Sequence, residues 1–151
     1  MTIELAQRKD KQKIARLDAH ISSLLLNECI RKGKIYVLKD DSVKNGSQNH
    51  RLSNPAVGIL RYSLFWQTIP FLDLLYIDEA YRNRGFGTQM MHEWETAMAI
   101  RGYKYVMTST QADEDAWKFY EKLGYQKVGG FFPPEQEAKE WMYLKRLGLS
   151  D

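Results

Sequence analysis

The stretch RNRGFGT at residues 82–88 constrains the fold more than any other, because it separates two segments of opposite character. The residues before it, 70–77 (PFLDLLYI), are nearly all apolar and have the length of a buried strand. After it, apolar residues recur at helical spacing as far as Arg101, and Gly102 stands where a helix C-cap favours glycine. The chain is therefore predicted to pass from a strand, through a turn with two glycines, into a helix.

Similar patterns predict the other elements. Strands are expected at residues 3–6, 34–39, 56–66, 70–77, 103–109, 125–132 and 140–147. Helices are expected at residues 10–30, as one broken helix or two short ones, and at 86–101 and 113–123. The polar segment 40–54 is predicted to be a turn or a hairpin loop.

The order of these elements predicts how the strands pair. Strands that follow each other without a helix favour antiparallel pairs, whereas the strands at 70–77 and 103–109 are joined by a helix and should be parallel neighbours. A chain of 151 residues is long enough for one domain with a proper core. We therefore predict a single α/β (α+β) domain over residues 1–151, with a mixed, mostly antiparallel sheet of six to seven strands and helices on both faces.

Composition excludes several classes of protein. The net charge of +3 would help to attract an anionic ligand, but it is far below the basic excess of a nucleic-acid binder. Cys29 is the single cysteine, so no internal disulfide can form. The charged start of the chain lacks the apolar core of a secretory signal, and no segment approaches the roughly 20 apolar residues that span a bilayer. A soluble, cytoplasmic protein that binds neither nucleic acid nor membranes is expected.

The glycine-containing turn has the properties of a phosphate site. The first amides of a helix lack intrahelical acceptors, and the helix dipole adds positive charge there. Glycine lets a ligand approach the backbone, so a phosphate or pyrophosphate fits, and Arg82 and Arg84 could add charge. Two known phosphate motifs are absent: Met90 replaces the third glycine of the dinucleotide fingerprint, and Gly87 is followed by Thr88 rather than by the lysine of a P-loop. From this stretch alone, a plain turn that happens to contain glycines remains an equal alternative.

The surroundings of the turn favour one protein family. Residues 76–94 (YIDEAYRNRGFGTQMMHEW) resemble the signature of the GNAT superfamily of N-acetyltransferases, Arg/Gln-x-x-Gly-x-Gly/Ala after a strand and an acidic turn. Residues 113–131 (DEDAWKFYEKLGYQKVGGF) resemble that family's second conserved block, and the order of elements fits the family over nearly the whole chain. The matching positions are Arg82, Gly85 and Gly87 in the first block and Ala116, Tyr120, Leu123, Gly124 and Tyr125 in the second.

The resemblance implies that acetyl-CoA is the acetyl donor and that transfer to a primary amine is direct, in a ternary complex. In this family the amides of the glycine-rich turn hold the pyrophosphate; here they belong to Asn83, Arg84, Gly85, Phe86, Gly87 and Thr88. The preceding strand pairs with the pantetheine arm, a role that falls on Leu75, Tyr76 and Ile77. By the same match, the Leu75 amide would stabilise the oxyanion that forms on the thioester carbonyl.

Tyr120 matches the family tyrosine that protonates the leaving CoA thiolate. Because Tyr120 also lies on the apolar face of its predicted helix, a core tyrosine is the alternative. The family often has an asparagine seven residues earlier that contacts pantetheine; Asp113 replaces it here and is expected to cap the helix instead. Thr110 or Gln111 could then supply the pantetheine contact.

The general base is the least determined residue. Some relatives carry a carboxylate where this chain has Phe71, so that arrangement is absent. Asp73 shares a strand face with Phe71 and is the candidate base, although a surface acid is an equal alternative. Glu28 and His20, on the early helices, are more distant alternatives. Cys29 could in principle form an acetyl-enzyme, but no histidine or motif supports such a route, and a small buried cysteine is expected.

The family does not name the acceptor, because its members acetylate small amines, antibiotics, polyamines, protein N-termini and lysines. Residues 19–33, 64–71 and 129–141 are expected to build the acceptor side, and the partner would be a small-molecule or peptide amine. Candidate walls are the aromatic residues Phe65, Trp66, Phe71, Phe131 and Phe132 and the acidic residues Glu135, Glu137 and Glu140, with core aromatics and a solvated loop as the alternatives. The resemblance is also compatible with a homodimer.

Two other functions compete with catalysis. A protein that kept the CoA site but lost catalysis would act as a sensor or interaction module. A nucleotide-binding domain would use the same turn for a different phosphate, although the second sequence block argues against it. No metal site is expected.

Overall fold

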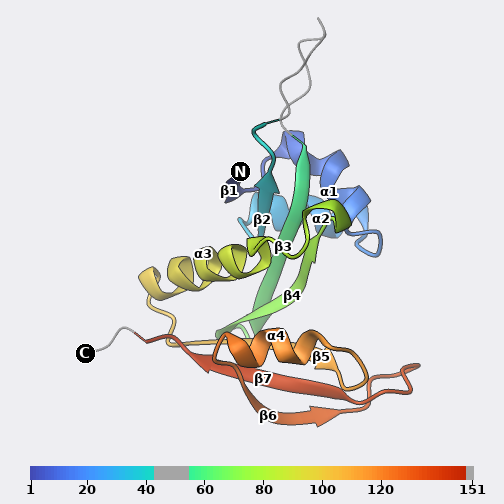
Figure 1. Ribbon diagram of the computed structural model, residues 1–151, viewed down its shortest axis with the longest axis vertical. Coiled ribbons are helices and arrows are strands. Elements are labelled where there is room, and N and C mark those ends of the chain that lie inside the picture. Colours follow the sequence, from blue (N-terminus) through green and yellow to red (C-terminus); the bar gives the residue numbers. More distant parts are fainter. Residues whose placement is uncertain (43–54, 149–151) are drawn as a thin grey trace, which may run out of the picture. The chain divides into compact units, whose positions relative to one another are not determined.

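The computed structural model describes residues 1–42 and 55–148 (Figure 1). Most of the predicted loop at 40–54 lies outside these residues. The strands are β1 (Thr2–Leu5), β2 (Ile35–Lys39), β3 (Ala56–Phe65), β4 (Ile69–Ile77), β5 (Tyr105–Gln111), β6 (Gln126–Phe131) and β7 (Glu140–Arg146). The helices are α1 (Lys11–Leu17), α2 (Ser23–Arg31), α3 (Phe86–Ile100) and α4 (Ala116–Lys122), with 3-10 turns η1 (Arg8–Asp10) and η2 (Glu79–Tyr81). Each predicted element is present, and the early broken helix is two helices.

The strands form one sheet of seven, in the order β1-β2-β3-β4-β5-β7-β6. The ladders β1–β2, β2–β3, β5–β7 and β6–β7 are antiparallel. The ladder β4–β5 is parallel and comprises two residue pairs, Phe71 with Met107 and Leu72 with Thr108. The predicted mixed, mostly antiparallel sheet is therefore confirmed, and so is the parallel pair across α3.

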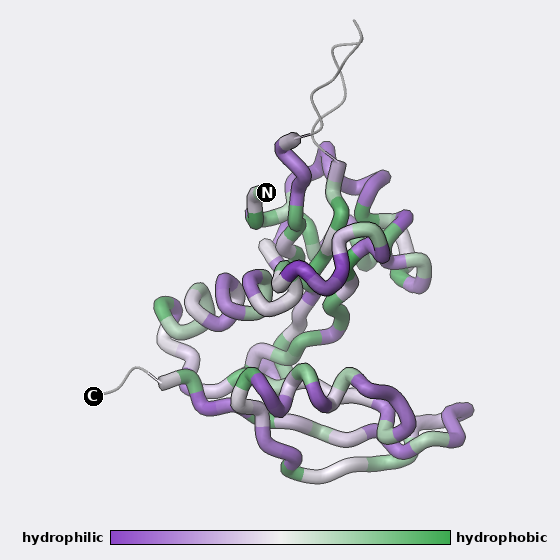
Figure 2. The backbone as a smooth tube through the Cα atoms, in the orientation of Figure 1, coloured by the Kyte–Doolittle hydropathy of each residue, from purple (hydrophilic) through white to green (hydrophobic). Residues whose placement is uncertain are grey.

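The chain divides into two compact units. The first contains Met1–Arg61 and Leu74–Trp94, and the second contains Tyr62–Asp73 and the chain from Glu95 onward. Three elements, β3, β4 and α3, contribute residues to both units. Figure 2 shows both hydrophobic and hydrophilic residues along α3, as expected of an amphipathic helix.

The first unit has an apolar core between its strands and the pair of helices α1 and α2. The core cluster consists of Ala6, Ile14, Leu26, Ile35, Val37 and Ile59. Successive strand residues point to opposite faces, yet Leu38 and Leu60 on the other face are fully buried as well. Both faces of these strands are therefore covered, as the predicted helices on both faces require.

The second unit has an aromatic core beneath α4. The rings of Tyr120 and Tyr125 meet edge-on, with 5.7 Å between their centroids. The Tyr125 hydroxyl donates a 3.2 Å hydrogen bond to Glu95, whose other carboxylate oxygen accepts from the ammonium of Lys145. Burial and this carboxylate raise the pKa of Tyr125, so its hydroxyl keeps the proton that it donates.

Glycine ends the helix of each conserved block, as the sequence predicts. Gly102 and Gly124 have φ of +93° and +92°, and each is followed by the backbone bonds of a Schellman motif. The start of α4 differs from the prediction. Its N-cap is Asp115 and not Asp113, because the chain makes one further turn after β5 before the helix begins.

The hairpin between β3 and β4 turns at Trp66 and Gln67, whose φ angles are 51° and 57°. The Thr68 amide closes this turn on the Phe65 carbonyl at 3.0 Å. Left-handed φ at two successive residues is usual for a tight hairpin, but Asn and Gly are the usual residues there. The side chain of Trp66 is 81% exposed at this tip.

Candidate active site

The glycine-containing turn lies in the first unit, between η2 and the first residue of α3. Asn83 and Gly85 have φ of 60° and +80°, a left-handed conformation that asparagine tolerates and glycine adopts without strain. Each of these residues redirects the backbone, and α3 begins immediately afterwards at Phe86. A Cβ placed on Gly85 would meet no atom within 4 Å, so the space beside the turn is open.

The turn presents a run of main-chain donors. Within the described part of the chain, the amides of residues 83–88 make no hydrogen bond, whereas the next amide, that of Gln89, bonds to the Gly85 carbonyl at 3.1 Å. The last three of these six amides open a 15-residue helix, whose dipole places partial positive charge at the same point. The turn can therefore bind a phosphate or pyrophosphate through its backbone.

The two arginines of the turn lie against tyrosine rings. Arg82 donates from Nε to the Ile77 carbonyl at 2.8 Å, and its guanidinium lies 5.3 Å from the centre of the Tyr76 ring. The Arg84 guanidinium lies 5.6 Å from the ring centre of Tyr81. Arg82 thus ties the turn to the end of β4, and both exposed guanidinium groups add positive charge around the amides.

A carboxylate outside both conserved blocks anchors this region. The Tyr81 hydroxyl donates a 2.6 Å hydrogen bond to Asp40, and both the hydroxyl and the amide of Ser42 donate to the same carboxylate. These bonds lower the pKa of Asp40 to about 2 and raise the pKa of Tyr81. Sequence reasoning missed Asp40, because no local pattern links residues that stand 41 positions apart.

The second half of β4 presents alternate peptide groups to its two edges. The Asp78 amide donates to the Val57 carbonyl at 2.8 Å, and a Cβ on Gly58 would lie 3.3 Å from the Tyr76 carbonyl oxygen. Because peptide groups alternate along a strand, Tyr76 faces β3, whereas Leu75 and Ile77 face the opposite edge. Of the three residues predicted to pair with pantetheine, these two present their main chain away from β3.

Tyr120 lies in the second unit and is 8% exposed. Its hydroxyl is hydrogen-bonded to Thr108, and the Thr108 hydroxyl donates to the Leu72 carbonyl at 3.2 Å. Burial raises the pKa of Tyr120 to about 12. Tyr120 therefore stays protonated at neutral pH and can act as a hydrogen-bond donor.

The remaining predicted residues also belong to the second unit. Asp73 is exposed on β4. Gln111 ends β5, half-buried and paired across the ladder with Glu140, and its carbonyl accepts from the Glu114 amide at 3.2 Å. The structure therefore groups the turn with Leu75 and Ile77 in one unit, and Tyr120 with Asp73 and Gln111 in the other.

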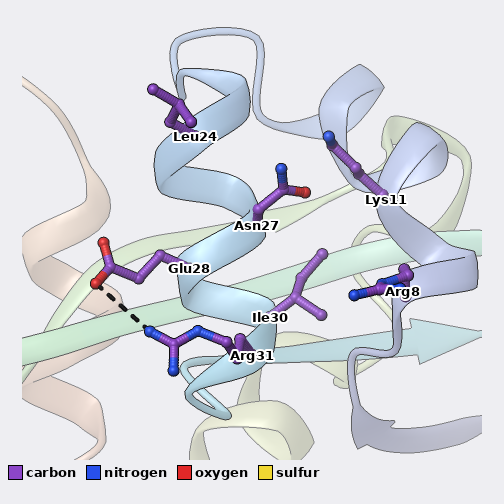
Figure 3. Close-up of a pocket in the computed structure, with 7 residues that line it drawn as sticks. All are labelled: Arg8, Lys11, Leu24, Asn27, Glu28, Ile30 and Arg31. Atoms are coloured by element: carbon purple, nitrogen blue, oxygen red, sulfur yellow. Dashed lines mark ion pairs between the residues drawn. The ribbon is translucent and has the colours of Figure 1, made fainter.

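A pocket of about 680 Å³ lies in the first unit. Figure 3 shows the residues that line it. It is lined by Arg8, Lys11, Leu24, Asn27, Glu28, Ile30 and Arg31, most of which belong to the segment 19–33 predicted for the acceptor side. Glu28 supplies the negative charge of the lining, but it pairs with Lys32 at 2.7 Å and with Arg31 at 4.0 Å. With Arg8, Lys11 and Arg31 in its walls, the pocket favours an anionic group over a protonated amine.

The described residues contain no cluster of three or more His, Cys, Asp or Glu side chains arranged to bind a metal ion. They also contain no helix with the length and apolar character needed to cross a membrane.

Comparison with known proteins identifies the family. The model of the acetyltransferase (GNAT) family matches residues 12–125, and no curated protein sequence matches the chain. Among solved structures, Ard1 from Thermoplasma volcanium has a TM-score of 0.78 at 17% identity, over 97% of both chains. A chain of the NatC complex bound to Gag peptide and CoA has a TM-score of 0.76 at 15% identity, over 97% of this chain and 98% of that one.

An aminoglycoside 6'-N-acetyltransferase complexed with coenzyme A also has a TM-score of 0.76, at 16% identity, over 100% of this chain and 99% of that one. At such low identities these likenesses show the fold, which agrees with the strand order and the turn described above. The family model covers the first conserved block and the second as far as Tyr125, and so includes every matching position in both. The chain belongs to the GNAT family of acetyltransferases.

Proposed function

We propose that the chain, as a single domain over residues 1–151, transfers an acetyl group from acetyl-CoA to a primary amine by direct attack in a ternary complex. The observation that carries this proposal is the run of six amides without acceptors at residues 83–88, at the start of a long helix. Such a run fits the pyrophosphate of CoA, which needs several donors and little side-chain bulk. Arg82 and Arg84 add positive charge around it.

When bound, acetyl-CoA supplies the acetyl group as a thioester, whose C–S bond breaks as the C–N bond to the amine forms. The amide of Leu75, which faces away from β3, is proposed to donate to the thioester oxygen as negative charge develops there. A main-chain donor in this role is worth about 3 kcal/mol of the barrier. The main chain of Ile77 is proposed to pair with the pantetheine arm, and Gln111 to contact the same arm from β5.

Tyr120 is proposed to donate a hydrogen bond to the leaving sulfur. Its pKa of about 12 lies well above the value of about 8.5 for a free thiol. Complete transfer of the phenol proton to the thiolate would therefore be uphill by about 5 kcal/mol. Tyr120 thus stabilises the thiolate while keeping its own proton, and solvent can supply the proton later.

The attacking nitrogen must lose a proton, and Asp73 is proposed to accept it, directly or through water. The acceptor is proposed to be a small-molecule or peptide amine. The related folds include one bound to a peptide and one that acts on aminoglycosides, so both kinds of acceptor occur on this fold.

A cytoplasmic location is proposed as well. With Cys29 as its single cysteine, the chain forms no internal disulfide, in keeping with the reducing cytoplasm.

Thermal unfolding with acetyl-CoA, CoA, ATP and NAD in parallel tests the cofactor. A ligand at 100 times its dissociation constant stabilises the folded state by roughly 2.7 kcal/mol, which is readily detected. We expect stabilisation by acetyl-CoA and CoA alone. Stabilisation by ATP or NAD alone would reject the proposal, and CoA binding without thiol release over a panel of amines would indicate a sensor or interaction module instead.

A further inference from the structure

Glu140, the first residue of β7, is held in place by two neutral donors. Its Oε1 accepts a 2.8 Å hydrogen bond from the hydroxyl of Ser109 on β5, and its Oε2 accepts a 2.9 Å hydrogen bond from Nε2 of Gln136. The same Gln136 nitrogen also donates to the Ala138 carbonyl at 2.9 Å, which fixes the amide. The half-buried carboxylate therefore has a defined position, set by a strand and by the loop before β7.

The charge of Glu140 is not compensated by a cation. Within residues 1–42 and 55–148, the buried carboxylates of Asp10, Asp18 and Glu95 each pair with a lysine or an arginine. No cationic side chain lies within 4 Å of Glu140, which, like the buried Asp40, has neutral donors only. A half-buried negative charge with neutral partners alone is costly, because it gives up part of its hydration without gaining an ion pair. An incoming cation would offset that cost.

Two lysines of the hairpin formed by β6 and β7 lie on the other face of the sheet. Lys139 and Lys127 both contact the ring of Trp141, with their ammonium nitrogens 4.5 and 4.0 Å from its centre. Trp141 follows Glu140 in β7, so its side chain points to the opposite face. These two lysines therefore do not neutralise Glu140.

The face that carries Glu140 is also the face away from α4. Thr108, which bonds to Tyr120 of α4, is next to Ser109 on β5, so the two side chains point to opposite faces. Phe131 stands directly across the ladder from Glu140 and is 50% exposed. An aromatic ring beside an unpaired carboxylate forms a place where a cation can bind by charge and by its contact with the ring.

We propose that Glu140 binds a positively charged group of the acceptor, and that the acceptor is consequently an amine with a second cationic group. The reacting nitrogen must be neutral when it attacks, so an ion pair that lasts through the reaction needs another charge on the same molecule. Phe131 contributes its ring to the same group, and Ser109 and Gln136 position the carboxylate. This inference rests on the proposed acetyl transfer and adds its substrate class.

The test compares 1,4-diaminobutane with n-butylamine, which has the same chain length but a single amine. Initial rates of CoA thiol release are measured at saturating acetyl-CoA for the wild type, Glu140→Gln, Glu140→Asp and the control Glu137→Gln, an exposed acid of the same loop. We expect the wild type to favour the diamine in kcat/KM by at least about tenfold, the value of one hydrogen-bonded charge contact. Glu140→Gln should remove that preference through KM, Glu140→Asp should keep part of it, and Glu137→Gln should keep all of it.

Acetyl-CoA affinity, measured by calorimetry on each variant, separates this inference from the proposed function. If acetyl-CoA does not bind the wild type, the proposed function itself fails. If acetyl-CoA binds and the wild type acetylates both amines without preferring the diamine, the role of Glu140 is rejected. Acetyl-CoA binding without thiol release from either amine counts instead against the acetyl transfer on which that role rests. An unchanged preference in Glu140→Gln rejects it as well.

Discussion

The glycine-containing turn and the Glu140 site differ in what they are made of. The turn is one short stretch of chain in the first unit, and its donors are main-chain amides. The Glu140 site lies in the second unit and combines side chains from β5, β7 and the loop between β6 and β7. A site built from backbone tolerates many side chains but demands glycine where a ligand approaches, whereas a site built from side chains depends on the register of the strands that carry them.

The largest effect is expected from Gly87→Glu. A side chain and a negative charge would enter the proposed pyrophosphate site, and opposed like charges cost several kcal/mol, so acetyl-CoA affinity should fall at least about 100-fold. Calorimetric titration measures the change, with Gly148→Glu as the control, because a Cβ at Gly148 meets no atom within 4 Å. Equal acetyl-CoA affinities of Gly87→Glu and the wild type would show that the pyrophosphate does not bind at this turn. The comparison of a backbone site with a side-chain site would then no longer hold.

Tyr120, a side chain of the second unit, should affect kcat rather than acetyl-CoA affinity. Tyr120→Phe removes one hydrogen bond to the developing thiolate, so kcat should fall roughly 10- to 100-fold while acetyl-CoA affinity stays within about twofold. Stopped-flow or steady-state thiol release measures this, with the exposed Tyr105 changed to Phe as the control. Because the pKa of Tyr120 is about 12, the wild-type rate should show no tyrosine ionisation below about pH 11. An unchanged kcat at saturation would make Tyr120 a packing residue.

Asp40→Asn tests whether a side chain far from the turn also supports it. The pKa of Asp40 is lowered to about 2, so its carboxylate stabilises the folded state above pH 4 and loses that contribution as the pH falls from about 4 to about 2. The variant should therefore unfold at lower urea than the wild type at pH 7, and the difference should shrink between pH 4 and pH 2. Acetyl-CoA affinity at pH 7 should drop by a few-fold at most, since the amides themselves are unchanged.

Asp113→Asn, at an exposed acid of the second unit, is the control for this urea series. A difference between Asp40→Asn and the wild type that stays constant from pH 7 to pH 2 would contradict the assigned role of the carboxylate.

The smallest effect is expected at Cys29. The residue is half-buried against the core of the first unit, where a thiol serves packing. Intact-mass analysis after incubation with acetyl-CoA alone should show no added acetyl group on the protein. A stable acetyl adduct that maps to Cys29 would indicate a covalent route in place of direct transfer. The reacting group would then lie outside both the glycine-containing turn and the Glu140 site.

Much of the fold could be predicted from the sequence, because periodicity and glycine position are local signals. The turn, the ends of α3 and α4 at Gly102 and Gly124, and the parallel pair across α3 all follow from such signals. The N-cap of α4 could not, since three acids, Asp113, Glu114 and Asp115, stand in the same short stretch and each is able to precede a helix. The partners of individual strand residues could not be predicted either, because they depend on the register of the strands.

The candidate site also contains residues that the sequence reveals and residues that it does not. Residues 83–88 are recognisable because their spacing is fixed by the backbone conformation that they adopt. Asp40, Ser109 and Gln136 are not, because their partners are set by tertiary contacts between distant segments. In β4, the sequence predicted that Leu75, Tyr76 and Ile77 all pair with pantetheine. In the structure the main chain of Tyr76 faces β3, whereas those of Leu75 and Ile77 face the opposite edge.

The tight hairpin at Trp66 gives the protein a fluorescent reporter of its own. Trp66 is 81% exposed, whereas Trp94 in α3 is fully buried. Indole emission shifts to longer wavelength in water, and a quencher such as iodide reaches an exposed indole and not a buried one. Replacing Trp66 by Phe should therefore remove the most quenchable part of the emission, at the red edge of the spectrum. The difference between the two spectra is the signal of Trp66, and it reports ligand binding or unfolding near the hairpin without any added label.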